Sequence, residues 1–155
     1  MADNPESVLL DEARRGMGAQ VVTLDTLQTK SLAVLGAGAL VAGLAAPKVV
    51  GHAAPLVPAS LALAAFTVGA ILGIDVLRPR TWKFGERLGG YLQWTVDHGG
   101  EPNAERAFTR GLARNLELDR ADNATALQRL ELEFLAQCGL LALQVVLWAI
   151  AYALA

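Results

Sequence analysis

The chain has 155 residues, enough for one structural unit, and 54% of them are apolar, above the share of a typical soluble domain. Its formal net charge of −2 argues against a general nucleic-acid binder, because such proteins neutralise phosphates with a large cationic surplus. Asp, Glu, Lys and Arg are absent from the runs 31–47, 49–74 and 134–155, each close to the ~20 residues that cross a bilayer. We therefore expect an all-α membrane protein with three transmembrane helices and long cytoplasmic helical extensions.

Residues 1–30 are predicted to form a cytoplasmic amphipathic helix. Asn4, Pro5 and Glu6 supply a cap, a first-turn proline and a charge that complements the helix dipole. Apolar side chains then recur at steps of three and four residues, at Leu10, Ala13, Met17, Val21, Leu24 and Leu27. No proline or glycine pair separates this pattern from the first charge-free run. We therefore expect one continuous helix that enters the membrane.

Residues 31–77 are predicted to form a transmembrane hairpin, with spans at about 32–46 and 56–77 and a short turn that begins near Pro47. Basic residues follow the second span closely: Arg78, Arg80, Lys83 and Arg87. By the positive-inside rule this flank lies in the cytoplasm, and the amino terminus lies there too.

Residues 78–133 are predicted to form a cytoplasmic helical region. Its segment 82–94 mixes aromatic, basic and glycine residues, which favours a helix at the lipid headgroups and leaves an aromatic and basic ligand surface as the alternative. A helix capped by Asn103 then continues into the third span, 134–155, whose carboxyl end lies outside the cell. The aromatic residues near this end, Trp148 and Tyr152, suit a belt at the outer interface.

The second span carries two opposite faces of interest. Ala65, Gly69 and Gly73 repeat every four residues, and small side chains at this spacing let helices approach closely in lipid. The contact is either between spans of one chain or between subunits. Ser60 and Thr67 lie on the other face, which meets either water or another helix.

Gln137 and Gln144 are seven residues apart in the third span and so lie on one side of the helix. An amide without a partner is costly in hydrocarbon. Either these side chains bond to another helix, or they line a hydrated path in a symmetric oligomer. A path of this kind would be weakly selective, because no charged ring lies deep in any span.

Asp75 is an ionisable residue next to the apolar body of the second span. Charges inside a membrane are functional candidates by default. Here the position near the interface favours an ion pair with Arg78 or Lys30, and a gate or selectivity role is the alternative.

Arg106, Arg110 and Arg114 occupy one side of the cytoplasmic helix at four-residue steps. Such a cationic stripe could bind an anionic ligand. The alternative is a solvated face whose charge Glu117 and Asp119 offset.

The sequence lacks the signatures of an enzyme. The two histidines, His52 and His98, are predicted on opposite sides of the membrane, and Cys138 is the single cysteine. No residues have metal-ligand spacing, and no phosphate-binding glycine loop or nucleophile elbow is present. We expect no catalytic residues, no metal and no cofactor.

The overall arrangement resembles a family of defence proteins. An amino-terminal helix, a tight two-span hairpin, the basic exit from Arg78 to Gly85 and a long helix that returns to the membrane resemble the SLATT-like and Pycsar-type transmembrane effectors of bacterial anti-phage systems, and are similar to the Hailong channel effector. The resemblance implies a homo-oligomer, with a tetramer as a guess, in the bacterial inner membrane. It also implies control by a nucleotide or oligonucleotide signal, made by a partner nucleotidyltransferase or cyclase, and depolarisation that kills the infected cell.

Two functional hypotheses follow. The first is a ligand-controlled channel or pore, with Gln137, Gln144, Thr67 and Ser60 as candidate lining residues. The second is a non-conducting membrane anchor or adaptor that recruits a cytoplasmic partner through its helices. Both need the lipid bilayer as a partner.

Overall fold

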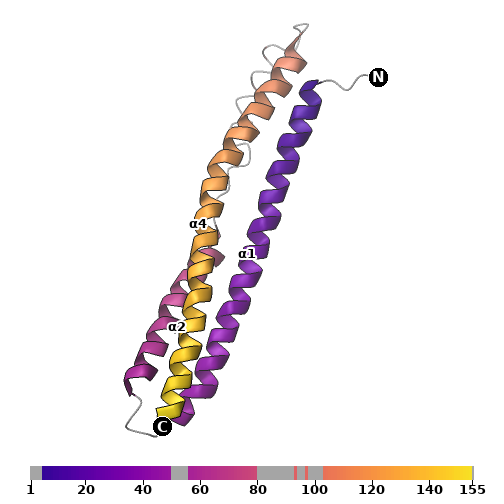
Figure 1. Cartoon of the computed structure of the whole chain (residues 1–155). Coiled ribbons are helices and arrows are strands. Elements are labelled where there is room, and N and C mark those ends of the chain that lie inside the picture. The colour runs from indigo at the N-terminus through magenta and orange to yellow at the C-terminus, as the bar shows by residue number, and fades with distance from the viewer. Residues whose placement is uncertain (1–4, 50–55, 80–92, 94–96, 98–102, 155) are drawn as a thin grey trace. The chain divides into compact units, whose positions relative to one another are not determined.

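A computed structural model describes residues 5–49, 56–79, 93, 97 and 103–154. The described chain is helical, with α1 over Pro5–Val49, α2 over Leu56–Leu77 and α4 over Ala104–Leu154 (Figure 1). Each of these helices is long and apolar enough to cross a membrane, as expected of an all-α membrane protein. The predicted turn after Pro47 and nearly all of the predicted interfacial segment 82–94 lie outside the described residues.

The chain divides into two compact units. Unit 1 comprises residues 1–24 and 80–128, and unit 2 comprises residues 25–79 and 129–155. Helices α1 and α4 each contribute a segment to both units.

Helix α1 passes Lys30 without a break, which confirms the continuous helix that the sequence predicts. It also includes Pro47 and ends at Val49, so the predicted end near Pro47 is early by two residues. A proline in the last turn removes one backbone bond, and few helical residues follow it to be disturbed. Within unit 1 the helix buries Ala13 and Met17 as predicted.

Val21 follows the helical spacing of the apolar residues of α1, and it is 41% exposed. The neighbouring Gln20 is half-buried instead, and its Nε2 donates a hydrogen bond to the carbonyl of Arg120 at 2.9 Å. An interhelical bond therefore turns a polar residue inward next to this valine.

Helix α4 begins after Asn103, whose carbonyl accepts a hydrogen bond from the amide of Ala107 at 3.0 Å. This bond places Asn103 at the predicted cap position. In unit 1, α4 buries a set of polar side chains beside its apolar ones: Asn115, Asp119 and Asn123. In unit 2 it buries Leu130 completely.

Unit 2 is a three-helix arrangement in which α1 and α4 run parallel and α2 runs antiparallel to both (Figure 1). At one end, Gln28 of α1 donates to the carbonyl of Val76 of α2 at 3.4 Å. At the other end, Ala62 of α2 packs with Trp148 and Ala151 of α4. Both ends of α2 are therefore held against the same pair of helices.

The position of Trp148 corrects one expectation. Its indole is only 3% exposed and belongs to the packed end of unit 2, whereas Tyr152 is 61% exposed. The predicted aromatic belt is therefore wrong for Trp148. The large indole ring fits into the packed end of the unit because its neighbours Ala62 and Ala151 are small.

Much of the outer surface of unit 2 is apolar and exposed. Leucine and valine side chains on its helices expose two thirds or more of their area, as at Leu40 with 67%, Leu44 with 74% and Val57 with 70%. Large exposed apolar surfaces mark contact with membrane or protein. Lipid is the covering that helices of this length and hydropathy fit.

Candidate functional site

The first part of the candidate site consists of hydrogen bonds between α1 and α4. Gln137 and Ser31 bond reciprocally: the Ser31 hydroxyl donates to Gln137 Oε1 at 2.8 Å, and Gln137 Nε2 donates to the Ser31 carbonyl at 3.2 Å. Gln137 is 2% exposed and Ser31 is fully buried. Both ends of the amide are thus satisfied inside the unit, as burial in a low-dielectric core requires.

Gln144 forms the second bond of the pair. Its Nε2 donates to the carbonyl of Gly38 at 2.9 Å, and the side chain is 1% exposed. Ser31 and Gly38 are seven residues apart, as are Gln137 and Gln144. We call these two contacts the glutamine clasps.

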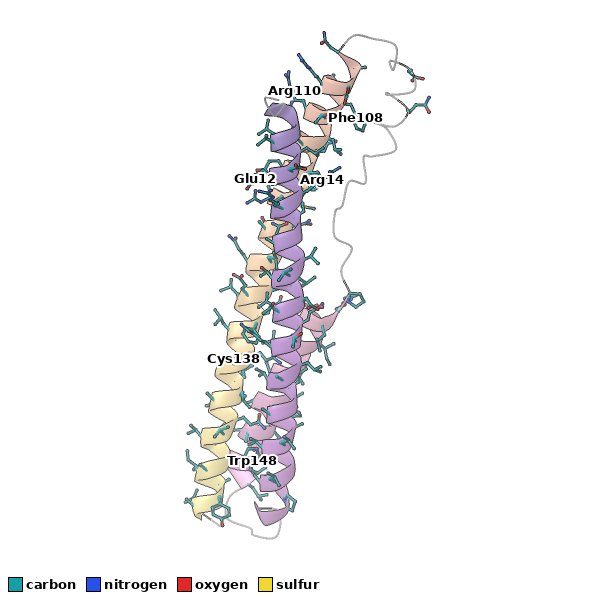
Figure 2. All side chains as sticks on the ribbon, turned by 90° about the vertical axis from the view of Figure 1, so that its right-hand side faces the viewer. Glu12, Arg14, Phe108, Arg110, Cys138 and Trp148 are labelled. Carbon is teal, nitrogen blue, oxygen red and sulfur yellow. The ribbon has the colours of Figure 1, made fainter. Side chains whose placement is uncertain are left out.

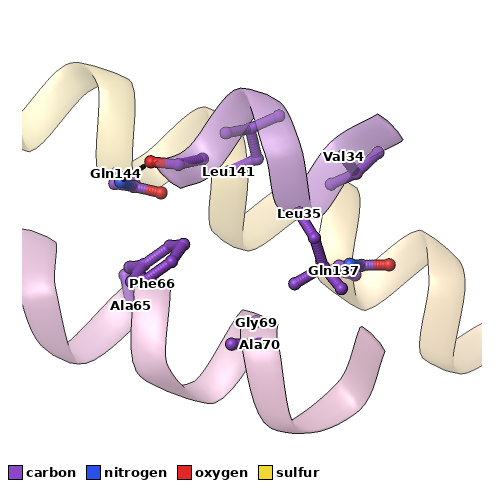
Figure 3. A pocket seen from close by; sticks show the side chains of 10 residues that line it. Val34, Leu35, Ala65, Phe66, Gly69, Ala70, Gln137, Leu141 and Gln144 are labelled. Carbon is purple, nitrogen blue, oxygen red and sulfur yellow. Dashed lines mark hydrogen bonds between the residues drawn. The ribbon is translucent and has the colours of Figure 1, made fainter. Parts of the chain in front are cut away.

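The small-residue stripe of α2 lies against the glutamine clasps (Figure 3). A Cβ atom added to Gly73 would lie 2.5 Å from Gln137 Nε2 and 2.9 Å from Leu35 Cδ1. At Gly69 the nearest atom, Leu140 Cβ, would be 3.6 Å away, an ordinary contact. Ala65 is also buried. These neighbours all belong to the same chain, so the stripe serves packing between spans of one chain.

A small cavity of about 10 Å³ lies among the three helices beside Phe66, Gln137 and Gln144 (Figure 3). This is about the volume that one water molecule needs. The structure brings Gln137 and Gln144 together in the arrangement that interhelical bonding predicts.

Ser60 and Thr67 lie apart from the glutamines, on the exposed side of α2. The Ser60 hydroxyl donates to the Val57 carbonyl at 2.9 Å, and the Thr67 hydroxyl donates to the Leu63 carbonyl at 2.9 Å. Each donor is thus satisfied by its own helix. The side of α2 that buries Ala62, Ala65, Gly69, Gly73 and Val76 is the opposite one.

Asp75 lies beside a residue that the sequence analysis did not name. Its Oδ2 is 3.7 Å from Nη2 of Arg129 in α4, and Arg129 Nε donates to Glu133 Oε1 at 2.7 Å. The hydrogen bond to Glu133, then the charges of Glu133 and Asp75, raise the pKa of Arg129. The guanidinium therefore stays charged where α4 approaches its long apolar run.

The predicted arginine stripe divides into two parts in unit 1. Arg110 and Arg114 line a groove of about 290 Å³ between residues 9–13 of α1 and 110–117 of α4, whereas Arg106 is not part of its lining; all three arginines are exposed. The groove also contains two carboxylates, Glu12 and Glu117. Figure 2 labels Glu12 and Arg110, one on each of the two helices.

The apolar part of the groove consists of Leu9, Ala13 and Ala113. Glu117 also lies 3.5 Å from Arg120. The groove is therefore balanced in charge, and one of its carboxylates, Glu117, is among those that the sequence already places beside the arginines.

Sequence reasoning missed Ser31, Gly38, Arg129 and Glu12 as members of these sites. For Ser31 and Gly38 a signal was present, because their seven-residue spacing matches that of Gln137 and Gln144. For Arg129 and Glu12 no local pattern distinguishes them from other charges on an exposed helix face.

Among the described residues, no three His, Cys, Asp or Glu side chains are grouped so that they could hold a metal ion. Comparisons with protein-family models, with curated proteins and with solved structures find no match to this chain.

Proposed function

We propose that the chain is a homo-oligomeric channel effector of the bacterial inner membrane, with the exposed face of α2 lining the path. The amino terminus lies in the cytoplasm and the carboxyl terminus outside, in accord with the basic residues that follow α2. A nucleotide-type signal, made by a partner nucleotidyltransferase or cyclase, controls the path and thereby depolarises the infected cell. The resemblance in architecture supports this last part.

The observation that carries the proposal is the two-sided character of α2. Its buried side is made of small residues that pack within the chain, and Ser60, Thr67 and Arg78 are exposed on the opposite side. Within α2, Ser60 and Thr67 lie about 20° apart at 100° per residue, and Arg78 follows directly after the helix ends at Leu77. This polar line of two hydroxyls on the exposed side of an otherwise apolar helix supports a surface that meets water on that side.

The glutamine clasps have a different task in this proposal. They hold each protomer together, so Gln137 and Gln144 do not line the path. The hydroxyls of Ser60 and Thr67 can accept hydrogen bonds from water while they donate to their own helix. The path is therefore weakly selective along the spans, and a ring of Arg78 side chains at its cytoplasmic mouth favours anions.

Flux measurements on purified protein in liposomes test the channel directly. We expect ion flux from the wild type, and we expect Thr67→Leu to reduce it because an apolar ring at that depth opposes wetting. Val68→Leu is the matched control, since Val68 is an exposed neighbour off the polar line. An oligomer that conducts neither alone nor with nucleotides would overturn the proposal, and equal effects of both changes would remove α2 as the lining.

A second candidate function is a non-conducting anchor or adaptor. The burial of both glutamines favours it, because the strongest polar groups of the spans are used inside one chain. This alternative predicts a stable complex with a soluble partner and no toxicity on overexpression. Loss of membrane potential on overexpression would exclude it.

A further inference from the structure

The exposed side of α2 changes in chemistry toward the carboxyl end of the helix. Ser60 and Thr67 carry hydroxyls on this side, whereas Ile71 and Ile74, which follow them, are apolar and 62% and 63% exposed. At 100° per residue, Ile71 lies about 40° from Thr67 around the helix axis, and Ile74 lies about 20° from it. The two isoleucines therefore continue the line of the two hydroxyls.

The isoleucines form an apolar stretch between the hydroxyls and Arg78. From Thr67 the helix rises by about 15 Å before it ends. Val68 is the other exposed side chain in this interval, and it lies about 100° from Thr67, off the line. Asp75 is half-buried and is paired with Arg129 of α4. A water molecule that follows the line past Thr67 therefore meets no hydrogen-bonding side chain on it before Arg78.

The type of side chain also distinguishes this stretch. The chain contains three isoleucines, Ile71, Ile74 and Ile150, whereas leucine and valine supply most of its other exposed large apolar side chains. An isoleucine in a helix keeps one χ1 rotamer in about 90% of cases. The surface that Ile71 and Ile74 form therefore has a fixed shape, and it changes place only when α2 moves.

The opposite side of α2 at this level is packed against the same chain. Gly73 lies between the two isoleucines in the sequence, and a Cβ atom added to it would lie 2.5 Å from Gln137 Nε2 and 2.9 Å from Leu35 Cδ1. Gln137 is itself held by its bonds to Ser31. The helix is thus anchored at the level of the isoleucines, and these are the side chains that it presents outward there.

We propose that Ile71 and Ile74 form a hydrophobic gate in the path that α2 lines. In a homo-oligomer each of them contributes to an apolar ring, and water withdraws from a narrow apolar constriction, so that ions do not pass. The path is polar on both sides of this gate, at Thr67 and at Arg78. The gate rests on the proposed channel function, and it explains the closed state of that channel.

Ion flux from liposomes that contain the full-length protein and no nucleotide tests the gate. We expect Ile71→Thr and Ile74→Thr each to raise the flux about tenfold over the wild type, because a hydroxyl restores a hydrogen bond to water in the ring. Threonine is β-branched like isoleucine, so the change keeps the branch at Cβ. Flux that stays at the wild-type level in both variants would overturn the gate and assign the two isoleucines to a lipid-facing surface.

Two control variants show whether the effect belongs to the line and to polarity. Val68→Thr adds a hydroxyl to an exposed side chain off the line, and Ile74→Val keeps an apolar, β-branched side chain on it. We expect both variants to conduct as the wild type does. A rise in Val68→Thr equal to that in the isoleucine variants would overturn the gate, because position on the helix would then not matter.

A large solute in the same liposomes separates an opened path from a damaged membrane. We expect Ile71→Thr and Ile74→Thr to pass ions while the liposomes retain a trapped fluorescent dextran. Release of the dextran together with the ions would indicate general disruption of the bilayer and would overturn the gate.

The same measurements distinguish failure of the gate from failure of the channel. If the wild type and all variants conduct equally, the gate is overturned and the channel proposal stands. If none of them conducts, with or without nucleotides, the channel proposal falls and the gate falls with it. Higher flux in both threonine variants than in the wild type and in Val68→Thr supports both.

Discussion

The two units use the same hydrogen bond in different surroundings. In unit 1, Gln20 donates to the carbonyl of Arg120 at 2.9 Å, and in unit 2, Gln144 donates to the carbonyl of Gly38 at 2.9 Å. Gln20 is half-buried among residues that include many charges, whereas Gln144 is 1% exposed among apolar side chains. Equal bond lengths therefore do not imply equal contributions to stability. When the bond breaks, the amide of Gln20 meets water, whereas the amide of Gln144 meets hydrocarbon.

The packing beside the interhelical hydrogen bonds also differs between the two units. Gly73 leaves no space for a methyl group next to Gln137. In unit 1, a Cβ on Gly16 would lie 3.0 Å from the end of the Arg120 side chain, which can move away toward solvent. The comparison predicts that changes in unit 2 have larger effects than matching changes in unit 1.

The largest effect is expected from Gly73→Ala. The added methyl group would meet the side chains of Gln137 and Leu35, so both must shift, and Gln137 is held in place by its bonds to Ser31. Overpacking of this kind costs about 2–3 kcal/mol. Unfolding of the purified protein in mixed detergent micelles, followed by circular dichroism, measures the loss.

Gly69→Ala is the control for this change, because it adds the same methyl group at an ordinary contact distance from Leu140. We expect a change within about 0.5 kcal/mol. Equal destabilisation by both substitutions would show that close packing at Gly73 is not the special feature.

The second effect is expected from Gln137→Leu. Leucine is of similar size, and the change removes both hydrogen bonds of the reciprocal pair and leaves the buried Ser31 hydroxyl without this acceptor. Hydrogen bonds between membrane helices contribute about 0.6 kcal/mol on average and about 1.7 at most. We expect a loss of about 1.5 kcal/mol in the same unfolding experiment, and Ser31→Ala added to Gln137→Leu should restore part of it. A double variant less stable than the single one would contradict the reciprocal pairing.

A smaller effect is expected from Gln20→Leu in unit 1. The change removes the bond to Arg120 but also removes Gln20 Oε1, a buried oxygen without a hydrogen-bond partner among the described residues. These contributions oppose each other, so we expect a change within about 0.5 kcal/mol. Gln144→Leu, which deletes the equivalent bond in unit 2, should be more destabilising. The reverse order would break the comparison between the units.

The smallest effect is expected from Arg129→Gln. Its side chain is 69% exposed, and the glutamine amide can still donate a hydrogen bond to Glu133, whose side chain is 13% exposed. The ion pair with Asp75, at 3.7 Å, is the more exposed of the two. Exposed pairs are screened by salt and contribute little. We expect no measurable shift of the unfolding midpoint at 0.15 M salt. A large shift at that ionic strength would mean that lipid or another subunit covers the pair.

The sequence predicts the helices well and their mutual contacts poorly. Long charge-free runs and regular apolar steps set the bounds of α2 and the continuity of α1 and α4, because both depend on local composition. The ion-pair partner of a residue depends on which helix faces meet after folding. The sequence therefore predicts Arg78 or Lys30 as the partner of Asp75, whereas in the structure Arg129 of α4 lies beside it.

The candidate sites follow the same rule. That Gln137 and Gln144 share a side of their helix follows from their spacing, but that Ser31 and Gly38 face them requires knowledge of the parallel pairing of α1 with α4. Similarly, the arginine stripe and the nearby Glu117 are visible in the sequence, whereas the contribution of Glu12 to the groove is not, because Glu12 comes from a distant part of the chain.

The two glutamine clasps join residues with the same separation of 106 positions, at points one heptad apart. A slip of α1 past α4 by a single residue moves the helices by about 1.5 Å and would stretch both clasps at once. The hydrogen bonds of one clasp cannot stretch while those of the other stay intact. Sliding between these two helices within unit 2 therefore breaks both clasps or neither. The antiparallel α2 contacts this pair through the 3.4 Å bond from Gln28, the ion pair of Asp75 with Arg129, and the packing of Gly73 against Gln137 and Leu35. A change in the shape of this unit that keeps both clasps must therefore move α1 and α4 together against α2.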